Sequence, residues 1–403
     1  MKNHDAAKIW EKQRIGLKKI ESRPRDYPGY SVTCELWESI GLYGLASGIL
    51  RTYMELTSGN KFLAQNKINK LSMQKQNIKS FTMPKEYTER QLRVLYIPFV
   101  KYPNYGLDII YDGLCKVLGW ENVFEYPRKE TLHSGNSELC GNYPCFFHYP
   151  DDNCLTLKKA KGMLENNEFD FVLICMHQEQ SAISELGESL LKTSVPKFAL
   201  DQEDSYHVDY SFIDKYNILG YFKRELVCTE EYDPKIIPLT FSYPEQLMPI
   251  RFPEKKTKTM FWAGKSYYTR GLYIDRAQSI ARVKFPPNNL HRFQYAKILD
   301  STIIGLNLFG WGFDTVRYYE LPAHGCLLFS ERPPIPIYQD YVDGESAVFF
   351  SDLSEFTQKL RYLMSNPKEV SRIANNGYEY VKKHHTTDQR ARQMLSIMEG
   401  CIQ

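Results

Sequence analysis

The sequence lacks an apolar run long enough to span a bilayer, and it lacks the apolar core of a secretory signal. The best candidate for a span, IGLYGLASGIL at residues 40–50, is too short and is typical of a buried helix. The opening segment, MKNHDAAKIWEKQRIG, is charged. We therefore expect a cytoplasmic protein, with peripheral attachment at the inner membrane face left open.

A strong excess of charge is also missing. The 403 residues include 51 Lys and Arg against 48 Asp and Glu, which gives a net charge of +3. This balance leaves no electrostatic footprint for nucleic acid, so we expect no such partner. Residues 61–85 contain no Asp or Glu, and their charged side chains are all lysines. That stretch predicts either contact with a membrane surface or an acidic partner, or a solvated helix face, which is the interpretation we favour.

Cysteine is present in an odd number, nine, in a chain with no export signal, which indicates reduced thiols. Cys140, Cys145, His148 and Cys154 have the spacing C-x4-C-x2-H-x5-C, which could supply four zinc ligands. The spacing matches no standard zinc motif closely, and a polar loop with buried thiols is the interpretation we favour. We therefore expect no bound metal.

The length predicts two or three domains. Residues 1–90 have the pattern of a helical extension, with helices over 6–21, 34–57 and 61–79. From residue 91 to 245, short apolar runs such as LRVLYIPF and FDFVLIC alternate with segments of helical periodicity. This alternation predicts a parallel sheet with crossover helices, which is a Rossmann-like domain.

The same alternation restarts after residues 240–258, which are rich in proline and charge and have the composition of a linker. Residues 255–385 predict a second Rossmann-like domain, and residues 386–403 predict a terminal helix that packs back toward the first. The expected fold class is thus α/β, with two doubly wound domains and an N-terminal helical extension. Such folds place their ligand between the domains, at the carboxyl ends of the strands.

The most informative segment is LNLFGWGFDTVRYYELPAHGCLLFS at residues 306–330, which predicts strand, loop, helix and strand. In its loop, Gly310 and Gly312 allow the backbone to approach a ligand closely. The helix is expected to begin near Asp314 and Thr315. Free N–H groups at a helix N-terminus suit a diphosphate, so this turn is a candidate phosphate site.

Arg317 and Glu320 lie three residues apart on one face of that predicted helix. The Arg317 guanidinium can reach an anion at the helix start, and the Glu320 carboxylate can accept hydrogen bonds from two ribose hydroxyls. Asp314 complicates this hypothesis, because a capping carboxylate would compete with a phosphate for the same N–H groups. The alternative for Arg317 and Glu320 is a surface ion pair.

A set of short motifs runs through the second half of the sequence, with two further pieces in the first half. They are S-x-I-x-x-L-N at 301–307, G-x-G-F-D-T-x-R-x-x-E at 310–320, A-x-G-x-L-L at 323–328, D-G-E-S-A-V-F-F at 343–350, L-x-x-L-x-x-x-P at 360–367, H-T-x-x-x-R at 385–390, DQED at 201–204 and YFKRE at 221–225. With these motifs the second half resembles group 1 glycosyltransferases of the GT-B fold, and most closely a spore-maturation-like subgroup. The first half resembles this family mainly in its α/β pattern and in the two short pieces, and residues 1–90 match no family.

The resemblance implies that Glu320 binds the donor ribose, that Arg317 lies near the diphosphate or the sugar, and that the loop at 310–315, including Phe313, contacts the donor. Many members carry a glutamate pair, E-x7-E, but Gly312 stands at the first of those positions. This leaves inverting and retaining transfer both open. Basic residues after the first strand of the second half neutralise the leaving diphosphate in relatives, without a metal. Here the segment FWAGKSYYTR offers Gly264 together with the basic residues Lys265 and Arg270.

The first half is expected to supply the acceptor site and a general base. An inverting transferase needs a carboxylate or a histidine that takes the acceptor proton. Candidates at predicted strand ends are His177, Asp201 and Asp204, with Glu203 between the last two. For His177 the alternative is a hydrogen-bonded polar residue at a helix start.

The leading hypothesis is therefore a glycosyltransferase that moves a sugar from a nucleotide-sugar donor to a saccharide, a lipid-linked or a protein acceptor, with no cofactor. One alternative is a sugar-nucleotide epimerase on the same scaffold. Another is a non-catalytic module that binds a nucleotide-sugar.

Overall fold

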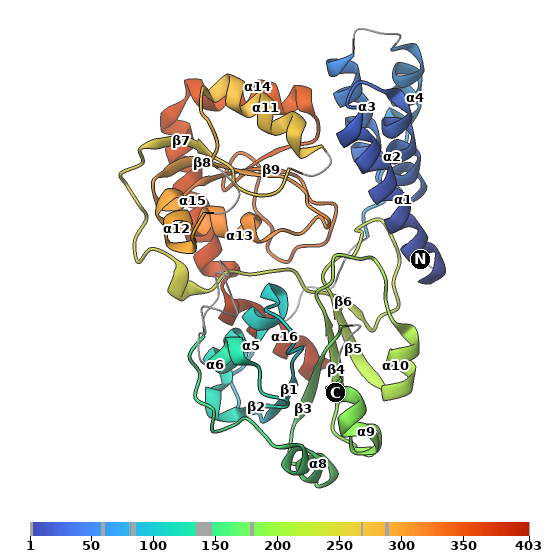
Figure 1. Cartoon of the computed structure of the whole chain (residues 1–403), viewed down its shortest axis with the longest axis vertical. Helices are drawn as coiled ribbons and strands as arrows, with labels where there is room; N and C mark the ends of the chain where they lie inside the picture. The colour runs from blue at the N-terminus through green and yellow to red at the C-terminus, as the bar shows by residue number, and fades with distance from the viewer. Residues whose placement is uncertain are drawn as a thin grey trace.

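The computed structural model describes residues 3–57, 61–79, 81, 86–133, 147–177, 181–266, 269–286 and 290–402. It consists of an N-terminal helical bundle and two α/β domains (Figure 1). The expected fold class is thus confirmed. No helix in these ranges is both long enough and apolar enough to cross a membrane.

In the described part of residues 1–90 the bundle contains four helices, where the sequence pattern predicted three. The predicted helix over 34–57 is wrong, because the chain turns at Gly41, which has φ of 74°. That left-handed conformation favours glycine and ends a helix. The bundle helices are α1 (Asn3–Ser22), α2 (Tyr27–Ser39), α3 (Tyr43–Leu56) and α4 (Phe62–Ser72).

The first α/β domain is built on a six-stranded parallel sheet with the order β2-β1-β3-β4-β5-β6. Every residue of β3 is buried, as expected for a strand covered on both faces. The strands are β1 (Val94–Ile97), β2 (Val123–Glu125), β3 (Phe171–Cys175), β4 (Lys197–Asp201), β5 (Ile218–Lys223) and β6 (Ile236–Pro238). The helical segments are α5 (Tyr105–Leu118), η1 (Trp120–Asn122), α6 (Glu130–His133), α8 (Leu157–Glu165), α9 (Ala182–Lys192), α10 (Tyr210–Tyr216) and η2 (Glu245–Leu247).

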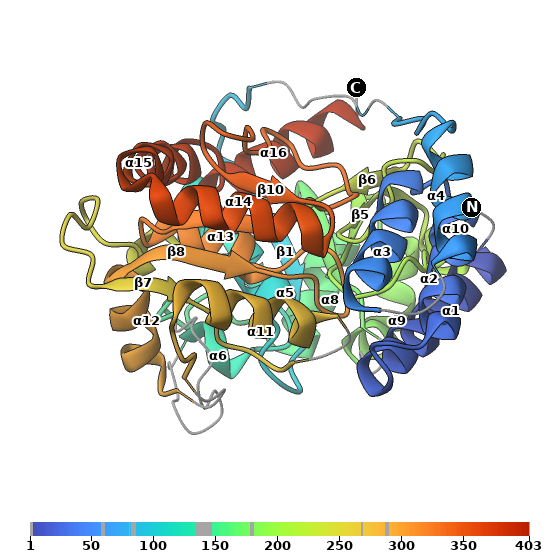
Figure 2. The same ribbon diagram turned by 90° about the horizontal axis from the view of Figure 1, so that it is seen from above.

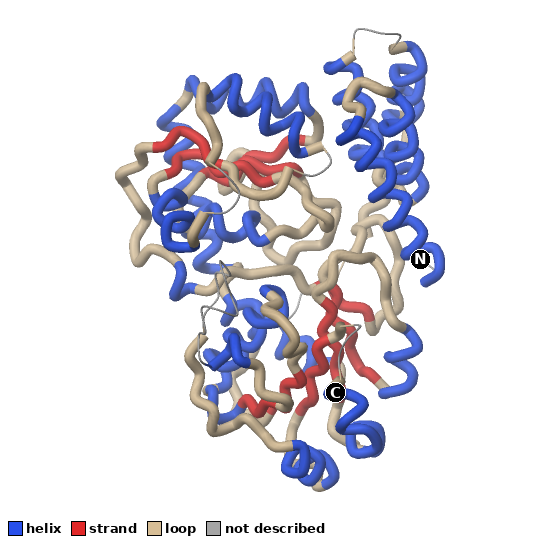
Figure 3. The backbone as a smooth tube through the Cα atoms, viewed as in Figure 1, coloured by secondary structure: helices blue, strands red, loops and turns tan. Residues whose placement is uncertain are grey.

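The second α/β domain has a four-stranded parallel sheet with the order β10-β9-β8-β7. Helices α11 and α14 cover one face of this sheet, and α12, α13 and α15 lie on the other (Figures 1 and 3). The strands are β7 (Lys258–Phe261), β8 (Thr302–Asn307), β9 (Leu327–Glu331) and β10 (Val348–Phe350). The helices are α11 (Arg270–Ala281), α12 (Arg292–Asp300), α13 (Val316–Ala323), α14 (Leu353–Ser365) and α15 (Pro367–His384).

The last helix, α16 (Thr387–Gly400), returns to the first α/β domain and packs on α5. Gly113 of α5 permits this close approach, because a Cβ there would overlap the carbonyl oxygen of Thr387. The Thr387 hydroxyl also donates to Asp112 at 2.5 Å. The chain therefore passes twice between the domains, and the N–H of Tyr243 on one passage donates to the His385 carbonyl on the other at 2.8 Å.

The helical bundle packs against both α/β domains at their junction (Figure 2). Its apolar cluster includes Tyr206 from the first domain and Phe313 from the second. Arg51 of α3 also forms an ion pair with Asp352, at the start of α14 in the second domain, at 2.5 Å. The bundle thus helps to fix the position of one domain relative to the other.

Candidate active site

The loops that follow β4 and β5 in the first domain meet the loop that follows β8 in the second. Arg224, directly after β5, is fully buried at this junction. Its Nη1 donates to the carbonyl of Asp314 at 2.8 Å, its Nε donates to the carbonyl of Gln202 at 3.0 Å, and it forms an ion pair with Asp204. A single guanidinium therefore joins the two domains.

Glu225 makes the complementary contact. Its buried carboxylate accepts the backbone N–H groups of Phe313 at 3.0 Å and Asp314 at 3.1 Å. Burial raises the pKa of Glu225 to about 7. A Cβ on Gly312 would overlap this carboxylate, so the close approach requires glycine. The N–H groups of Phe313 and Asp314 thus serve the domain junction.

Asp314 does not cap the helix as the sequence suggested. Helix α13 begins at Val316, and its N-cap Thr315 makes no side-chain cap bond. Instead the Asp314 carboxylate accepts the N–H of Phe241 at 2.7 Å, and burial raises its pKa to about 6. The Thr315 hydroxyl donates to Asn307 of β8 at 2.6 Å. The expected competition between Asp314 and a phosphate is therefore absent from this helix start.

Arg317 and Glu320 lie on α13 and have different partners. Arg317 donates to the Ala263 carbonyl at 3.1 Å, and its guanidinium lies 4.5 Å from the centroid of the Trp262 ring. Its buried Nε has no hydrogen-bond partner among the described residues. Glu320, 5% exposed, accepts the Tyr295 hydroxyl at 2.7 Å, and burial raises its pKa. A surface ion pair therefore does not describe these two side chains.

Arg270 is buried and ties together the loops that follow β7 and β8. It donates to the carbonyls of Phe309 at 2.7 Å, Lys265 at 3.0 Å and Leu308 at 3.1 Å. Its guanidinium lies over the same Trp262 ring as that of Arg317. This arrangement gathers two permanent positive charges at the carboxyl end of the second sheet.

The glycine and lysine expected in this region lie beside the arginines. Gly264 has φ of 154°, and a Cβ on it would come within 3.3 Å of the Arg317 guanidinium. Lys265 is exposed. Gly310 approaches Arg270 closely, whereas Phe313 is 2% exposed and packs in the cluster of the helical bundle.

A second group of side chains forms at the carboxyl ends of β1, β3 and β4 in the first domain. The Nε2 atom of His177 lies 2.6 Å from the Tyr102 hydroxyl and 3.6 Å from a carboxylate oxygen of Glu203. The imidazole stacks on Phe99 with a centroid distance of 3.7 Å. Burial raises the pKa of Glu203. The structure therefore brings a histidine, a phenol and a carboxylate into one cluster.

Asp201 and Asp204 have cationic partners. Asp201 is buried and accepts the Tyr221 hydroxyl at 2.6 Å and the Lys223 ammonium at 2.9 Å. Asp204 is half exposed and pairs with Arg224. The histidine cluster thus contains Glu203 rather than either aspartate.

The residues of the site that were not among the sequence candidates include Tyr102, Arg224, Glu225 and Trp262. Arg224 and Glu225 stand in YFKRE at the end of a predicted strand, which was the available signal. Their partners lie about ninety residues further along, where no local pattern points to them. Trp262 carries a weaker signal, its place directly after the β7 strand.

Two further segments singled out in the sequence are the cysteine-rich loop at 140–154 and the basic stretch at 61–85. Cys140 and Cys145 lie outside the described residues, His148 is exposed, and Cys154 lies beside Glu125 and His133. In the basic segment, part of which lies outside the described residues, Lys67 pairs with Glu38, and Lys79 with Glu231 at 2.6 Å. These lysines are therefore partly neutralised within the chain.

Part of the second domain is similar in sequence to a known family, and the whole fold is similar to solved structures. Residues 277–396 match the model of a family described as glycosyl transferase-like, and the matched segment includes Arg317 and Glu320. No similar protein was found among curated sequences. A solved glycosyltransferase from Rickettsia africae ESF-5 superposes with a TM-score of 0.52 at 9% identity, covering 78% of this chain and 99% of that one. HepE from Anabaena, solved with UDP-glucose, superposes with a TM-score of 0.50 at 9% identity, covering 77% and 100%.

The fold therefore belongs to the GT-B class, in which two Rossmann-like domains face each other. Within this fold, the glycosyl transferase-like segment, residues 277–396, covers most of the second domain and the last helix.

Proposed function

We propose that this chain is a glycosyltransferase, which binds a nucleotide-sugar on α13 of the second domain and transfers the sugar to a saccharide, a lipid-linked or a protein acceptor held by the first domain. The observation that carries the proposal is the pair Arg317 and Glu320 on one helix at the carboxyl end of the sheet, inside the matched segment. We further propose that the chain belongs to the spore-maturation-like subgroup, on the motifs at 310–320 and 343–350.

The diphosphate would be held by Arg317 at the start of α13. Its unpartnered buried Nε favours an anionic ligand, because a buried N–H without an acceptor costs free energy that a phosphate oxygen removes. Arg270 keeps the loops in place around this point, and Gly264 allows close approach of the chain beside the guanidinium. Lys265 is placed to add charge at the rim. These fixed cations would stabilise charge on the leaving diphosphate without a metal.

Glu320 would bind the ribose. A carboxylate has four lone-pair sites, so Glu320 can keep its bond from Tyr295 and still accept two vicinal hydroxyls. Because HepE is solved with UDP-glucose, UDP-sugars are the first donors to test.

On the acceptor side, His177 would act as the general base. Its imidazole has a phenol and a carboxylate within reach, so these groups can orient the ring and stabilise the imidazolium that forms on proton transfer. Asp201 and Asp204, originally candidates for the same role, would act as positioning residues through Lys223 and Arg224.

Peripheral membrane contact would use α4 and the segment that follows it. Four apolar side chains there are exposed by 63–82%, and they lie among the lysines of residues 61–79: Phe62, Leu63, Met73 and Ile78. An exposed surface of this composition suits an anionic lipid interface. The double variant Phe62→Ala, Leu63→Ala should reduce co-sedimentation with phosphatidylglycerol vesicles, whereas Tyr362→Ala, on an exposed residue of α14, should not. Equal sedimentation of all three proteins would refute this contact.

The donor site is tested by a thermal-shift panel of nucleotides and nucleotide-sugars, because a ligand that binds only the folded state raises its stability. Arg317→Ala and Glu320→Ala should each reduce the shift that the best ligand gives. Arg372→Ala is the matched control, since Arg372 forms an exposed i,i+3 ion pair with Glu369 on α15. If both donor-site variants bind as well as the wild type, the assignment is wrong.

Turnover experiments separate the proposal from its alternatives. Incubation of the enzyme with a UDP-sugar alone should leave the sugar configuration unchanged, whereas an epimerase would change it. Transfer or slow donor hydrolysis is expected, whereas a binding module would give neither.

A further inference from the structure

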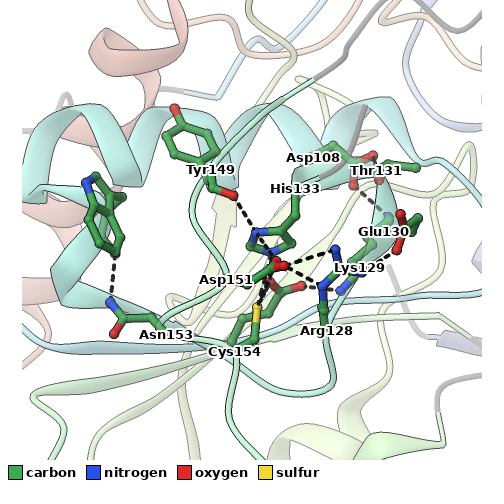
Figure 4. Close-up of polar contacts among 12 residues, drawn as sticks. Asp108, Arg128, Lys129, Glu130, Thr131, His133, Tyr149, Asp151, Asn153 and Cys154 are labelled. Atoms are coloured by element: carbon green, nitrogen blue, oxygen red, sulfur yellow. Dashed lines mark hydrogen bonds and ion pairs between the residues drawn. The ribbon is translucent and has the colours of Figure 1, made fainter. Parts of the chain in front are cut away.

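Three potential metal ligands converge in the first domain, away from the residues proposed for sugar transfer. Glu125 ends β2, His133 ends α6, and Cys154 precedes α8. The Nε2 atom of His133 lies 2.5 Å from Oε2 of Glu125 and 3.4 Å from Sγ of Cys154, and Sγ lies 3.7 Å from the same Oε2. Figure 4 shows the side chains of His133 and Cys154 directed toward each other, with Asp151 beside them.

The backbone holds two of these ligands in register. Glu125 and Cys154 form a parallel β-bridge. The N–H of Glu125 donates to the Asn153 carbonyl at 3.0 Å, and the N–H of Leu155 donates to the Glu125 carbonyl at 2.8 Å. The N–H of Lys129 binds Oε1 of Glu125 at 2.7 Å, which directs Oε2 toward the histidine and the thiol. The carboxylate and the sulfur are thus placed by the fold itself.

The third ligand, His133, is oriented through its other ring nitrogen. Nδ1 lies 2.9 Å from the carbonyl oxygen of Tyr149. A carbonyl can only accept, so Nδ1 carries a proton and donates it there. In the neutral ring the Nε2 lone pair then faces both the Glu125 oxygen and the Cys154 sulfur. Such a contact needs either a proton between the groups, carried by the ring, the carboxyl group or the thiol, or a metal ion.

The separations suit a metal ion. In a tetrahedral zinc site with the usual bond lengths, ligand atoms lie about 3.3–3.6 Å from one another. The distances from Sγ, 3.4 and 3.7 Å, are already close to that range. Binding of the ion would require the distance between Nε2 and Oε2, now 2.5 Å, to increase by about 0.9 Å. Nitrogen, sulfur and oxygen from these three residue types are common zinc ligands.

We infer that Glu125, His133 and Cys154 bind one Zn²⁺ ion. The fourth position would be taken by water, because Oδ1 of Asp151 lies 3.2 Å from the other ring nitrogen, Nδ1 of His133, and is held by Nε of Arg128 at 2.9 Å. Both the His133 and Glu125 side chains are at most 2% exposed, so the ion would be enclosed on their side. It would link β2, α6 and the segment before α8, which is a structural role separate from sugar transfer.

The site differs from the one that cysteine spacing suggested. Cys154 is common to both sets, whereas Glu125 and His133 were not sequence candidates and His148 is exposed. The expectation of metal-independent transfer concerns α13 and is unaffected by an ion in this position.

The test is the zinc content of the purified full chain. It is measured by inductively coupled plasma mass spectrometry after growth with added Zn²⁺. The wild type should contain about one zinc per chain. Cys154→Ser and His133→Gln should lose most of it, and Cys401→Ser, on an exposed thiol near the C-terminus, should keep it. Absence of zinc from the wild type, or full retention in both site variants, would overturn the proposal.

A second measurement covers the case in which the site variants fail to fold. A chelator added to the wild type should lower its Tm, and Zn²⁺ alone should restore it. Replacement of zinc by Co²⁺ should give a thiolate charge-transfer absorption band. If the chelator leaves Tm unchanged and Co²⁺ gives no such band, the three side chains are held together by a proton instead of a metal ion, and the inference is wrong.

Discussion

His177 lies within hydrogen-bonding distance of the Tyr102 hydroxyl and has Glu203 nearby, with Phe99 against one face of its ring. A ring stacked in this way has one principal orientation, so its nitrogen is presented at a fixed place. Glu203 is half exposed and can move toward the ring when an acceptor binds. At the scale of single residues, the proposed mechanism therefore depends on one side chain with two orienting neighbours.

The replacement His177→Gln should reduce sugar transfer by about 10²–10⁴-fold, because a general base typically contributes that factor. The thermal shift that the donor gives should remain at the wild-type value, since His177 is assigned to the acceptor side. The measurement is turnover under saturating donor, together with the donor-induced shift in Tm.

His207→Gln is the matched control for this variant. His207 is exposed and lies between β4 and α10, a few residues beyond Glu203, so its replacement should leave turnover unchanged. Undiminished turnover in His177→Gln would remove the histidine from the mechanism and point to a carboxylate such as Glu203.

At the scale of elements, the loop between β8 and α13 has two roles. Its first part binds Glu225 of the other domain through two N–H groups, and its last part leads into the helix that carries Arg317 and Glu320. The position of the helix start thus depends on how closely the loop approaches Glu225. Gly312 sets that distance, because any side chain would collide with the carboxylate.

Gly312→Ala should therefore destabilise the protein by about 1–3 kcal/mol, the usual cost of an added methyl group in a packed site. It should also weaken donor binding, because the loop before α13 must shift. Urea unfolding and the donor-induced shift in Tm measure the two effects.

Gly162→Ala provides the comparison, since a Cβ at this position of α8 would meet no atom within 4 Å. There the replacement should stabilise by about 0.5–1 kcal/mol through helix propensity. A Gly312→Ala protein as stable as wild type, with unchanged donor binding, would show that the approach to Glu225 does not position α13.

At the scale of the whole molecule, the two domains are joined by buried carboxyl groups and a buried guanidinium. Burial raises the pKa of Glu225 from 4.5 to about 7 and that of Asp314 from 3.8 to about 6. At a pH between the ordinary pKa of each group and its raised pKa in the folded protein, the folded protein holds a proton that the unfolded chain has released. The free energy of unfolding therefore falls as pH rises through this window, and it stays lower above the folded pKa values.

We expect the free energy of unfolding to decrease from pH about 5 to about 8, with a contribution from Glu225 of about 2–3 kcal/mol at about 1.4 kcal/mol per pKa unit. Glu225→Gln removes this titration, so its stability should depend less steeply on pH than that of the wild type. Asp314, Glu331 and Asp340 also have pKa values raised by burial, and they contribute to the slope in the same direction.

Urea unfolding across this pH range measures the slopes. Glu188→Gln is the control, because Glu188 is a surface residue of α9 paired with Lys192, and its replacement should leave the slope as in the wild type. Equal slopes for wild type and Glu225→Gln would mean that the junction carboxylate titrates at its ordinary pKa.

The sequence alone predicted the two Rossmann-like domains, the helical extension and the strand, loop and helix that carry Arg317 and Glu320. These features follow from local periodicity, since a buried parallel strand requires an uninterrupted apolar run and a covering helix requires an apolar stripe. The break between α2 and α3 escaped prediction because the apolar pattern continues through Gly41, and the backbone conformation there leaves no periodic signal.

Only the tertiary structure decided which polar side chains meet. Asp314 serves Phe241 instead of its own helix, Glu225 serves a loop of the other domain, and His177 has Tyr102 and Glu203 as neighbours. Likewise, Cys154 meets Glu125 and His133 instead of following its sequence spacing. The physical reason is that a hydrogen bond or a ligand contact depends on distance in space, and these partners come from different strands or domains. The apolar pattern fixes which elements form, but not which of their ends lie together.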